Sequence, residues 1–145
     1  MVAIGSDHAG YEYKEQLKKL LADLKIPFKD FGPDSPESTD YPDWAQKVAR
    51  SVSTGECEHG ILVCGTGIGM AIVANKHKGV RAAPCESVTA ARLARRHNNA
   101  NVLTIGARLT GWEAVADIVR TFFSEPFEGG RHERRVQKIH TLTSL

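Results

Sequence analysis

A glycine-rich turn between an apolar run and a helical segment constrains the fold more than any other feature. Residues 60–63 are typical of a buried strand, residues 70–76 predict a helix, and positions 64–69 between them read Cys-Gly-Thr-Gly-Ile-Gly. Glycines let backbone N–H groups face a ligand, and a helix N-terminus adds partial positive charge, so the turn is typical of an anion site. The same field favours the thiolate of Cys64. The sequence therefore predicts a base or nucleophile beside an anion hole.

Apolar runs and helical patterns alternate along the rest of the chain. Strands are expected at 2–4, 27–31, 60–63, 80–84 and 101–105, and helices at 13–24, 44–52, 70–76, 88–96 and 112–123, with a basic C-terminal helix after position 130. Short connections imply parallel strands joined by right-handed crossovers. We predict an α/β fold: a three-layer, Rossmann-like domain over residues 1–145, with a five-stranded parallel sheet and helices on both faces.

Composition excludes several classes of function. The formal charge of +2 is too small to indicate nucleic-acid binding, although residues 92–96 and 131–138 are basic enough to hold a small phosphorylated ligand. No long apolar segment and no leader-like start occur, so we expect neither a membrane span nor secretion. The three cysteines form no CxxC pair, which favours reduced thiols in the cytoplasm. The six histidines are scattered without zinc-type spacing, so no metal is expected.

Ligands of a parallel sheet bind beyond the carboxyl ends of its strands. The polar residues expected at those ends are Asp7, His8, Cys64 and Arg108. His97 and Asn98 instead precede the fifth strand, at the opposite end of the sheet. One subunit cannot easily bring His97 to the site, so a homodimer with shared sites is plausible.

Each candidate also has a purely structural interpretation. Cys64 could be a small buried residue, and its turn is neither the dinucleotide fingerprint nor a P-loop. Asp7 and His8 could form an ordinary turn, and His97 a helix cap. The basic stretch 131–138 could be a solvated helix face. Cys85 ends another strand and competes with Cys64, but we expect the charge of Glu86 to disfavour its thiolate.

Five segments, taken in order, resemble the B-type ribose-5-phosphate isomerases, a family that includes galactose-6-phosphate isomerase subunits. These segments are residues 5–10, 39–42, 64–69, 96–101 and 129–135. The resemblance implies reversible conversion of ribose 5-phosphate to ribulose 5-phosphate, without metal or cofactor. It also implies an assembly that is at least dimeric, with residues of two subunits in each site; dimers could pair into tetramers.

The resemblance further implies roles for individual residues. Cys64 would move a proton between C2 and C1, Thr66 would help hold the enediolate, and His97 would open the sugar ring. Asp7 and Tyr41 would contact the sugar, and Asn98 would lie beside His97. The turn residues Gly65, Gly67, Ile68 and Gly69 would help Thr66 to hold the enediolate. The phosphate would be bound by His8, Arg108, Arg131 and Arg135. Arg134 receives no role.

Three alternatives stay open at this point. The substrate could be a hexose 6-phosphate such as allose or galactose 6-phosphate. The chain could also be a non-catalytic sugar-phosphate or nucleotide-binding module with the same fold. A thiol-transfer or cysteine-hydrolase activity is a third and weaker possibility.

Overall fold

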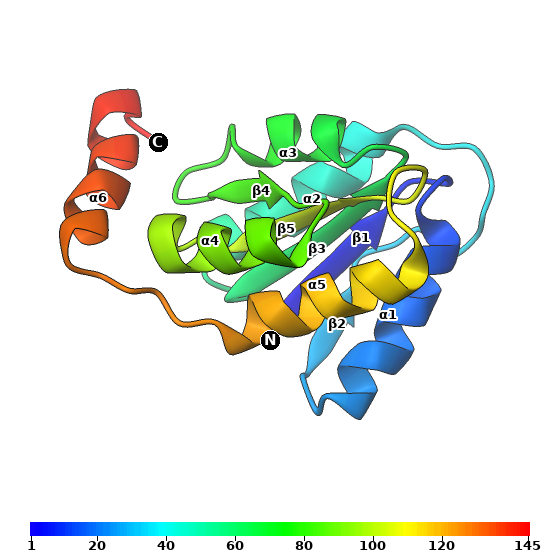
Figure 1. Ribbon diagram of the computed structural model, residues 1–145. Coiled ribbons are helices and arrows are strands. Elements are labelled where there is room, and N and C mark those ends of the chain that lie inside the picture. Colours follow the sequence, from blue (N-terminus) through cyan, green and yellow to red (C-terminus); the bar gives the residue numbers. More distant parts are fainter.

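The computed structural model covers residues 1–145 and contains one parallel sheet of five strands (Figure 1). The strands are β1 (Val2–Ser6), β2 (Phe28–Asp30), β3 (His59–Cys64), β4 (Ala82–Pro84) and β5 (Val102–Gly106). Their order is β2-β1-β3-β5-β4 and every pair is parallel, which confirms the predicted sheet. The fourth strand starts later than expected, because the Arg81 N–H donates to the Asn101 side chain at 2.8 Å instead of entering the ladder.

Five helices cover the two faces of the sheet, as predicted. Helices α1 (Tyr11–Asp23), α4 (Val88–Asn98) and α5 (Trp112–Ser124) pack on one face, and α2 (Tyr41–Ser53) and α3 (Ile68–Ala74) pack on the other. Successive residues of β1 point to opposite layers, so that Val2 and Ile4 enter the first core and Ala3 enters the second. Ser87 caps α4, since its Oγ accepts the Ala90 N–H at 3.0 Å.

Helix α6 (Arg131–Thr143) is the predicted basic helix, and it belongs to neither layer. Figure 1 shows it standing off the amino-terminal end of the sheet, joined to α5 by an extended segment. Val136 is its only buried residue, while Leu142 is 81% exposed. The chain end is tied back to the body, because the Leu145 carbonyl accepts the Gly79 N–H at 2.8 Å.

The helical pattern of α1 hides a buried charge that the sequence did not indicate. The Lys14 side chain is fully buried, and its Nζ lies 2.7 Å from Asp30 Oδ2. Asp30 also contacts Lys18 at 3.1 Å and accepts the Gly32 N–H at 2.8 Å. Burial raises the pKa of Asp30, but the hydrogen bonds from Lys14, Gly32 and Lys18 outweigh burial and hold the pKa below its usual value.

Both edges of the sheet are short. β2 and β4 have three residues each, whereas β1, β3 and β5 have five or six. Lys29 of β2 is paired with Glu56 at 2.7 Å, and β4 ends in Pro84. None of the helices combines the length and the apolar character that crossing a membrane requires.

Candidate active site

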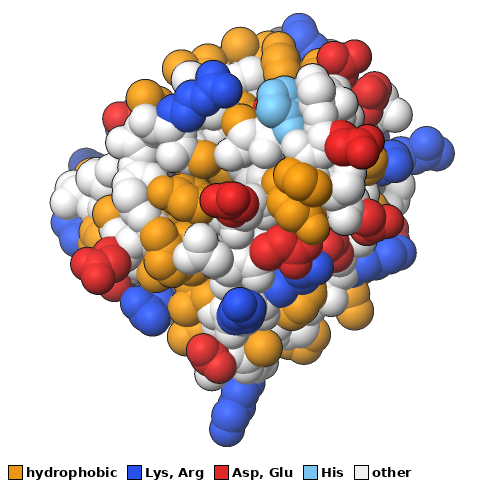
Figure 2. Space-filling view, turned by 90° about the vertical axis from the view of Figure 1, so that its right-hand side faces the viewer, with side chains coloured by type: hydrophobic (Ala, Val, Ile, Leu, Met, Phe, Trp, Pro, Cys, Tyr) orange, Lys and Arg blue, Asp and Glu red, His pale blue; other side chains and the backbone are white.

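A cavity of about 430 Å³ opens at the carboxyl ends of β1 and β3. Figure 2 looks onto this end of the molecule and shows apolar side chains interspersed with charged ones. The lining residues are Asp7, Tyr41, Cys64, Gly65, Thr66, Ile68, Gly69 and Ile72. The structure thus brings the turn together with two of the predicted sugar contacts, Asp7 and Tyr41. A volume of this size suits a small polar ligand.

Cys64 ends β3 and is only 5% exposed, with its sulfur held by the turn. The Gly67 N–H lies 3.1 Å from Cys64 Sγ. Gly67 adopts a φ of +78°, and a Cβ there would lie 2.9 Å from the Ile105 carbonyl carbon, so only glycine fits. A backbone N–H directed at sulfur stabilises the thiolate, which is the reactive form of a cysteine.

The turn also carries donors that the protein leaves free. The N–H groups of Gly65, Thr66 and Gly69 form no hydrogen bond within the chain, whereas that of Ile68 donates to Thr66 Oγ1 at 3.2 Å. The Thr66 hydroxyl accepts that bond and keeps its own proton to donate. Backbone donors beside a thiol can stabilise an oxyanion that forms there. Gly67 differs from the other glycines, because its N–H serves the sulfur.

Asp7 is almost fully buried, and its Oδ1 accepts the Gly10 N–H at 3.1 Å. The turn interpretation of Asp7 is therefore correct, and the residue lines the cavity as well. The Tyr41 ring packs against Gly69, where a Cβ would lie 2.7 Å from the ring. His8 lies outside the lining, with Nδ1 3.2 Å from both the N and O of Thr39.

Arg108 places a cation next to the turn. The Arg108 backbone N–H donates to the Gly65 carbonyl at 3.0 Å. The Arg108 side chain passes over Gly65, where a Cβ would meet Arg108 Cδ at 3.4 Å. This position, at the end of β5, agrees with the predicted contact to a phosphate.

Four predicted site residues lie away from the cavity: His97, Asn98, Arg131 and Arg135. His97 and Asn98 close α4 before β5, whereas the turn faces the far end of the sheet. Gly60, next to the start of β5, and Cys64 are four residues apart on β3, or roughly 13 Å at about 3.3 Å per residue. Within one chain, His97 and Cys64 therefore lie at opposite ends of the sheet. This separation was predicted from the sequence.

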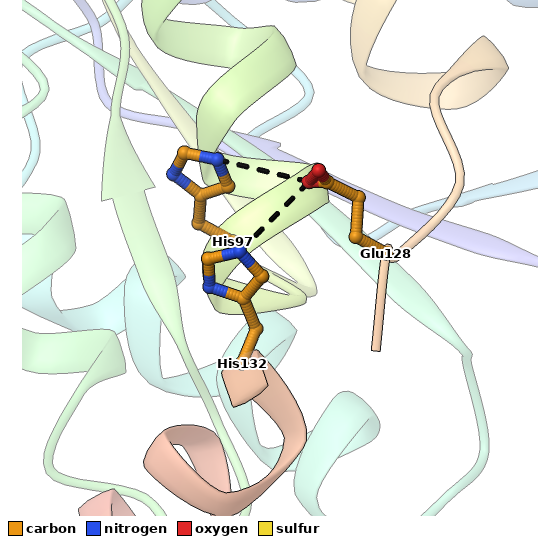
Figure 3. Close-up of side chains that lie close together, drawn as sticks. All are labelled: His97, Glu128 and His132. Carbon is orange, nitrogen blue, oxygen red and sulfur yellow. Dashed lines mark ion pairs between the residues drawn. The ribbon is translucent and has the colours of Figure 1, made fainter. Parts of the chain in front are cut away.

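His97 takes part in a cluster that sequence reasoning missed (Figure 3). Its ring stacks on His132 with centroids 4.4 Å apart and planes within 10°. Glu128 Oε2 faces both rings, 3.8 Å from His97 Nε2 and 3.9 Å from His132 Nε2. Burial lowers the pKa of His132, and the charge of His97 adds to that effect. The four-residue spacing of Glu128 and His132 is visible in the sequence, but nothing local shows that His97 meets them.

The other two cysteines are packed in the cores. Cys57 and Cys85 are 1% and 2% exposed. Burial raises the pKa of Cys85 to about 11, so this thiol stays protonated at neutral pH. Cys85 does not compete with Cys64, but the reason is burial rather than the charge of Glu86.

Comparison with known proteins agrees with this arrangement. Residues 2–139 match the Ribose/Galactose Isomerase family. The chain is 43% identical to ribose-5-phosphate isomerase B of Escherichia coli, over 97% of this chain and 95% of that one. It is 40% identical to D-erythrulose-4-phosphate isomerase of Pectobacterium atrosepticum, over 95% and 91%. The solved structure of Clostridium thermocellum ribose-5-phosphate isomerase B superimposes with a TM-score of 0.96 at 45% identity, over 99% and 97%. The chain therefore belongs to the ribose/galactose isomerase family and is an aldose–ketose isomerase.

Proposed function

We propose that this protein interconverts ribose 5-phosphate and ribulose 5-phosphate through an enediolate. The observation that carries the proposal is the Cys64 sulfur, 3.1 Å from the Gly67 N–H, in a cavity that also holds free backbone donors. An aldose and its ketose differ by one proton moved from C2 to C1, one proton moved from O2 to O1, and the position of the carbonyl. The reaction therefore needs a base between C1 and C2 and donors for the oxygen that becomes negative.

In this mechanism the Cys64 thiolate removes the proton from C2 of the open-chain aldose and returns it to C1, while the hydroxyl proton of O2 passes to O1. The N–H groups of Gly65, Thr66 and Gly69, with the Thr66 hydroxyl, stabilise the oxyanion of the intermediate. Asp7 and Tyr41 bind sugar hydroxyls, and Arg108 and His8 bind the phosphate. No metal is required for these steps.

We further propose that a second copy of the chain completes each site. Tyr41, Ile68 and Ile72 at the cavity are 41%, 53% and 57% exposed, which leaves an apolar rim for a partner to cover. The partner supplies His97 as the acid and base that opens the ring, Asn98 beside it, and Arg131 and Arg135 as phosphate ligands. The exposed apolar side of α6, which includes Ile139 and Leu142, supports the same assembly.

The substrate assignment is a pentose phosphate because the E. coli relative is named for ribose 5-phosphate. The Pectobacterium relative is named for a four-carbon phosphate, so D-erythrulose 4-phosphate is the second candidate. Allose and galactose 6-phosphate are the six-carbon alternatives.

The three free thiols support a reducing compartment, the cytoplasm.

The first experiment measures interconversion of ribose 5-phosphate and ribulose 5-phosphate by purified, metal-stripped protein, with Cys64→Ala alongside. We expect turnover by the wild type and a loss of about 100- to 10,000-fold in kcat without the base, which is the usual contribution of general acid–base catalysis. Turnover that survives in Cys64→Ala would disprove the thiol base. If the pentose is inert, the four- and six-carbon phosphates decide between another substrate and a binding protein.

A mixing experiment tests the shared site. Cys64→Ala and His97→Ala subunits are inactive separately, but a randomly mixed dimer contains one site with both groups intact. About a quarter of the wild-type activity should return when equal amounts are unfolded and refolded together, because half of the dimers are mixed and each has one complete site. Restoration of no activity would show that each site is built within one chain.

A further inference from the structure

We infer that Glu128, His97 and His132 form a binding site for a zinc-class divalent cation, whose occupancy withdraws His97 from catalysis. The second half of this inference rests on the proposed role of His97 in ring opening, whereas the site itself does not. Within one chain the cluster lies at the amino-terminal end of the sheet, away from that chain's own Cys64 cavity.

The donor set is the first argument for zinc. Two imidazoles and one carboxylate are ligands that Zn²⁺ takes readily, and three protein ligands with an open fourth position are typical of accessible zinc sites. One atom from each residue, all within 4.8 Å of one another, can serve as ligand. Figure 3 shows the two ring nitrogens and the carboxylate directed at a common space.

The distances are the second argument. The separations of 3.8 and 3.9 Å between Glu128 Oε2 and the two Nε2 atoms are too long for hydrogen bonds. The three groups are therefore close but make no direct bond to one another. A tetrahedral ion with ligands at about 2.0–2.2 Å sets those ligands roughly 3.4 Å apart, so each edge to Glu128 has to shorten by only about 0.5 Å.

The backbone positions the three groups and leaves two of them room to adjust. The Glu128 N–H donates to the Arg96 carbonyl at 3.1 Å, which fixes the connecting segment against the end of α4. The His132 side chain is 12% exposed, whereas those of His97 and Glu128 are 42% and 46% exposed. The rings lie within 10° of parallel, so the half-exposed His97 ring has to rotate before both lone pairs meet at one ion. Arg131 and Arg135 oppose a cation, so we expect moderate affinity.

A metal ion bound to His97 would block the proposed role of this residue in ring opening, because the ion occupies the lone pair of the imidazole nitrogen. An imidazole nitrogen that binds a metal ion can neither accept nor donate a proton, so a metal-bound His97 cannot open a sugar ring. Zinc should therefore inhibit by occupying this cluster, even though the base Cys64 lies in a different part of the chain.

Binding is tested with metal-stripped protein by titration calorimetry with ZnCl₂ and by the visible absorption of Co²⁺. We expect one ion per chain, and at least about 10-fold weaker binding in Glu128→Gln and in His132→Asn. Glu133→Gln is the matched control, because it removes the same charge next to His132 without removing a ligand, and it should bind within about 2-fold of wild type. Cys64→Ser should also retain the ion, with no thiolate-to-cobalt charge-transfer band in the wild type.

Two results would overturn the site: equal affinity in Glu128→Gln and wild type, or loss of the ion in Cys64→Ser. Activity then separates the two halves of the inference. We expect the inhibitory zinc concentration to rise at least 10-fold in Glu128→Gln. If the ion binds at the cluster and turnover persists, the proposed role of His97 is wrong and the site stands. If no ion binds and the enzyme is active, the site is wrong and the function stands.

Discussion

Replacing Gly67 with alanine tests whether the turn serves the Cys64 sulfur. Gly67 has a φ of +78°, and Gly55, in a loop far from the cavity, has a φ of +83°. An alanine at such an angle costs roughly 1–2 kcal/mol, so both substitutions carry this penalty. A Cβ at position 55 meets nothing within 4 Å, whereas one at 67 lies 2.9 Å from the Ile105 backbone. Gly55→Ala is therefore a control for the backbone angle alone.

The added methyl group at position 67 forces the backbone to move, which costs roughly another 1–3 kcal/mol. At about 2–4 °C per kcal/mol for a chain of this size, Gly67→Ala should melt at least 2 °C, and up to about 12 °C, below Gly55→Ala. Both are measured at one protein concentration, because the melting temperature of the proposed dimer would depend on concentration.

The catalytic effect is separate from the stability effect. In the proposed mechanism, moving the Gly67 N–H away from Cys64 Sγ removes a hydrogen bond to the thiolate, and a hydrogen bond to a charged group is worth roughly 1.5–3 kcal/mol. We expect kcat/KM to fall about 10- to 150-fold in Gly67→Ala and to stay unchanged in Gly55→Ala. Alkylation of the thiol by iodoacetamide should slow in the same variant. Equal melting temperatures and equal kcat/KM in the two variants would refute this account of the turn.

Other outcomes follow from the buried charge and from the buried thiol. Asp30→Asn leaves the buried Lys14 with only the more distant carboxylate of Glu15, at 3.6 Å, and should destabilise the fold by about 3 kcal/mol in denaturant titrations, whereas Lys14→Met should stay within about 1 kcal/mol of wild type. Because the folded pKa of Asp30 lies below its usual value, the pair stabilises the protein above about pH 4, and this contribution is lost as the pH falls through the folded pKa; Asp30→Asn should lack this acid-dependent loss. Mass spectrometry after brief alkylation at pH 7 should find the label on Cys64, since Cys85, with a pKa of about 11, stays protonated and buried.

The alternation of elements was predictable because each strand and helix carries its own period of apolar residues. The order of the strands was not, because nothing local shows that β5 lies between β3 and β4. The burial of Lys14 was missed for a similar reason. Its position on α1 resembles an exposed lysine until β2 brings Asp30 against it.

The same distinction between local sequence and distant contacts applies to the functional residues. The turn that contains Cys64, Thr66 and the glycines is one contiguous stretch, so it could be predicted from the sequence. Glu128 and His132 lie outside the helix that carries His97, and only the packing of α6 against the end of α4 brings them to it. Contacts that depend on how two separate segments meet leave no periodic pattern.

The short edge strands have a consequence for how copies of this chain can associate. β2 and β4 expose only three residues of unpaired backbone each, and the paired Lys29 and the N–H-less Pro84 lie on them. Such edges offer little template for another strand, which protects the sheet from edge-to-edge aggregation. Self-association is thereby directed to helices and turns, so the protein can expose an apolar rim around its cavity without inviting the growth of a continuous sheet.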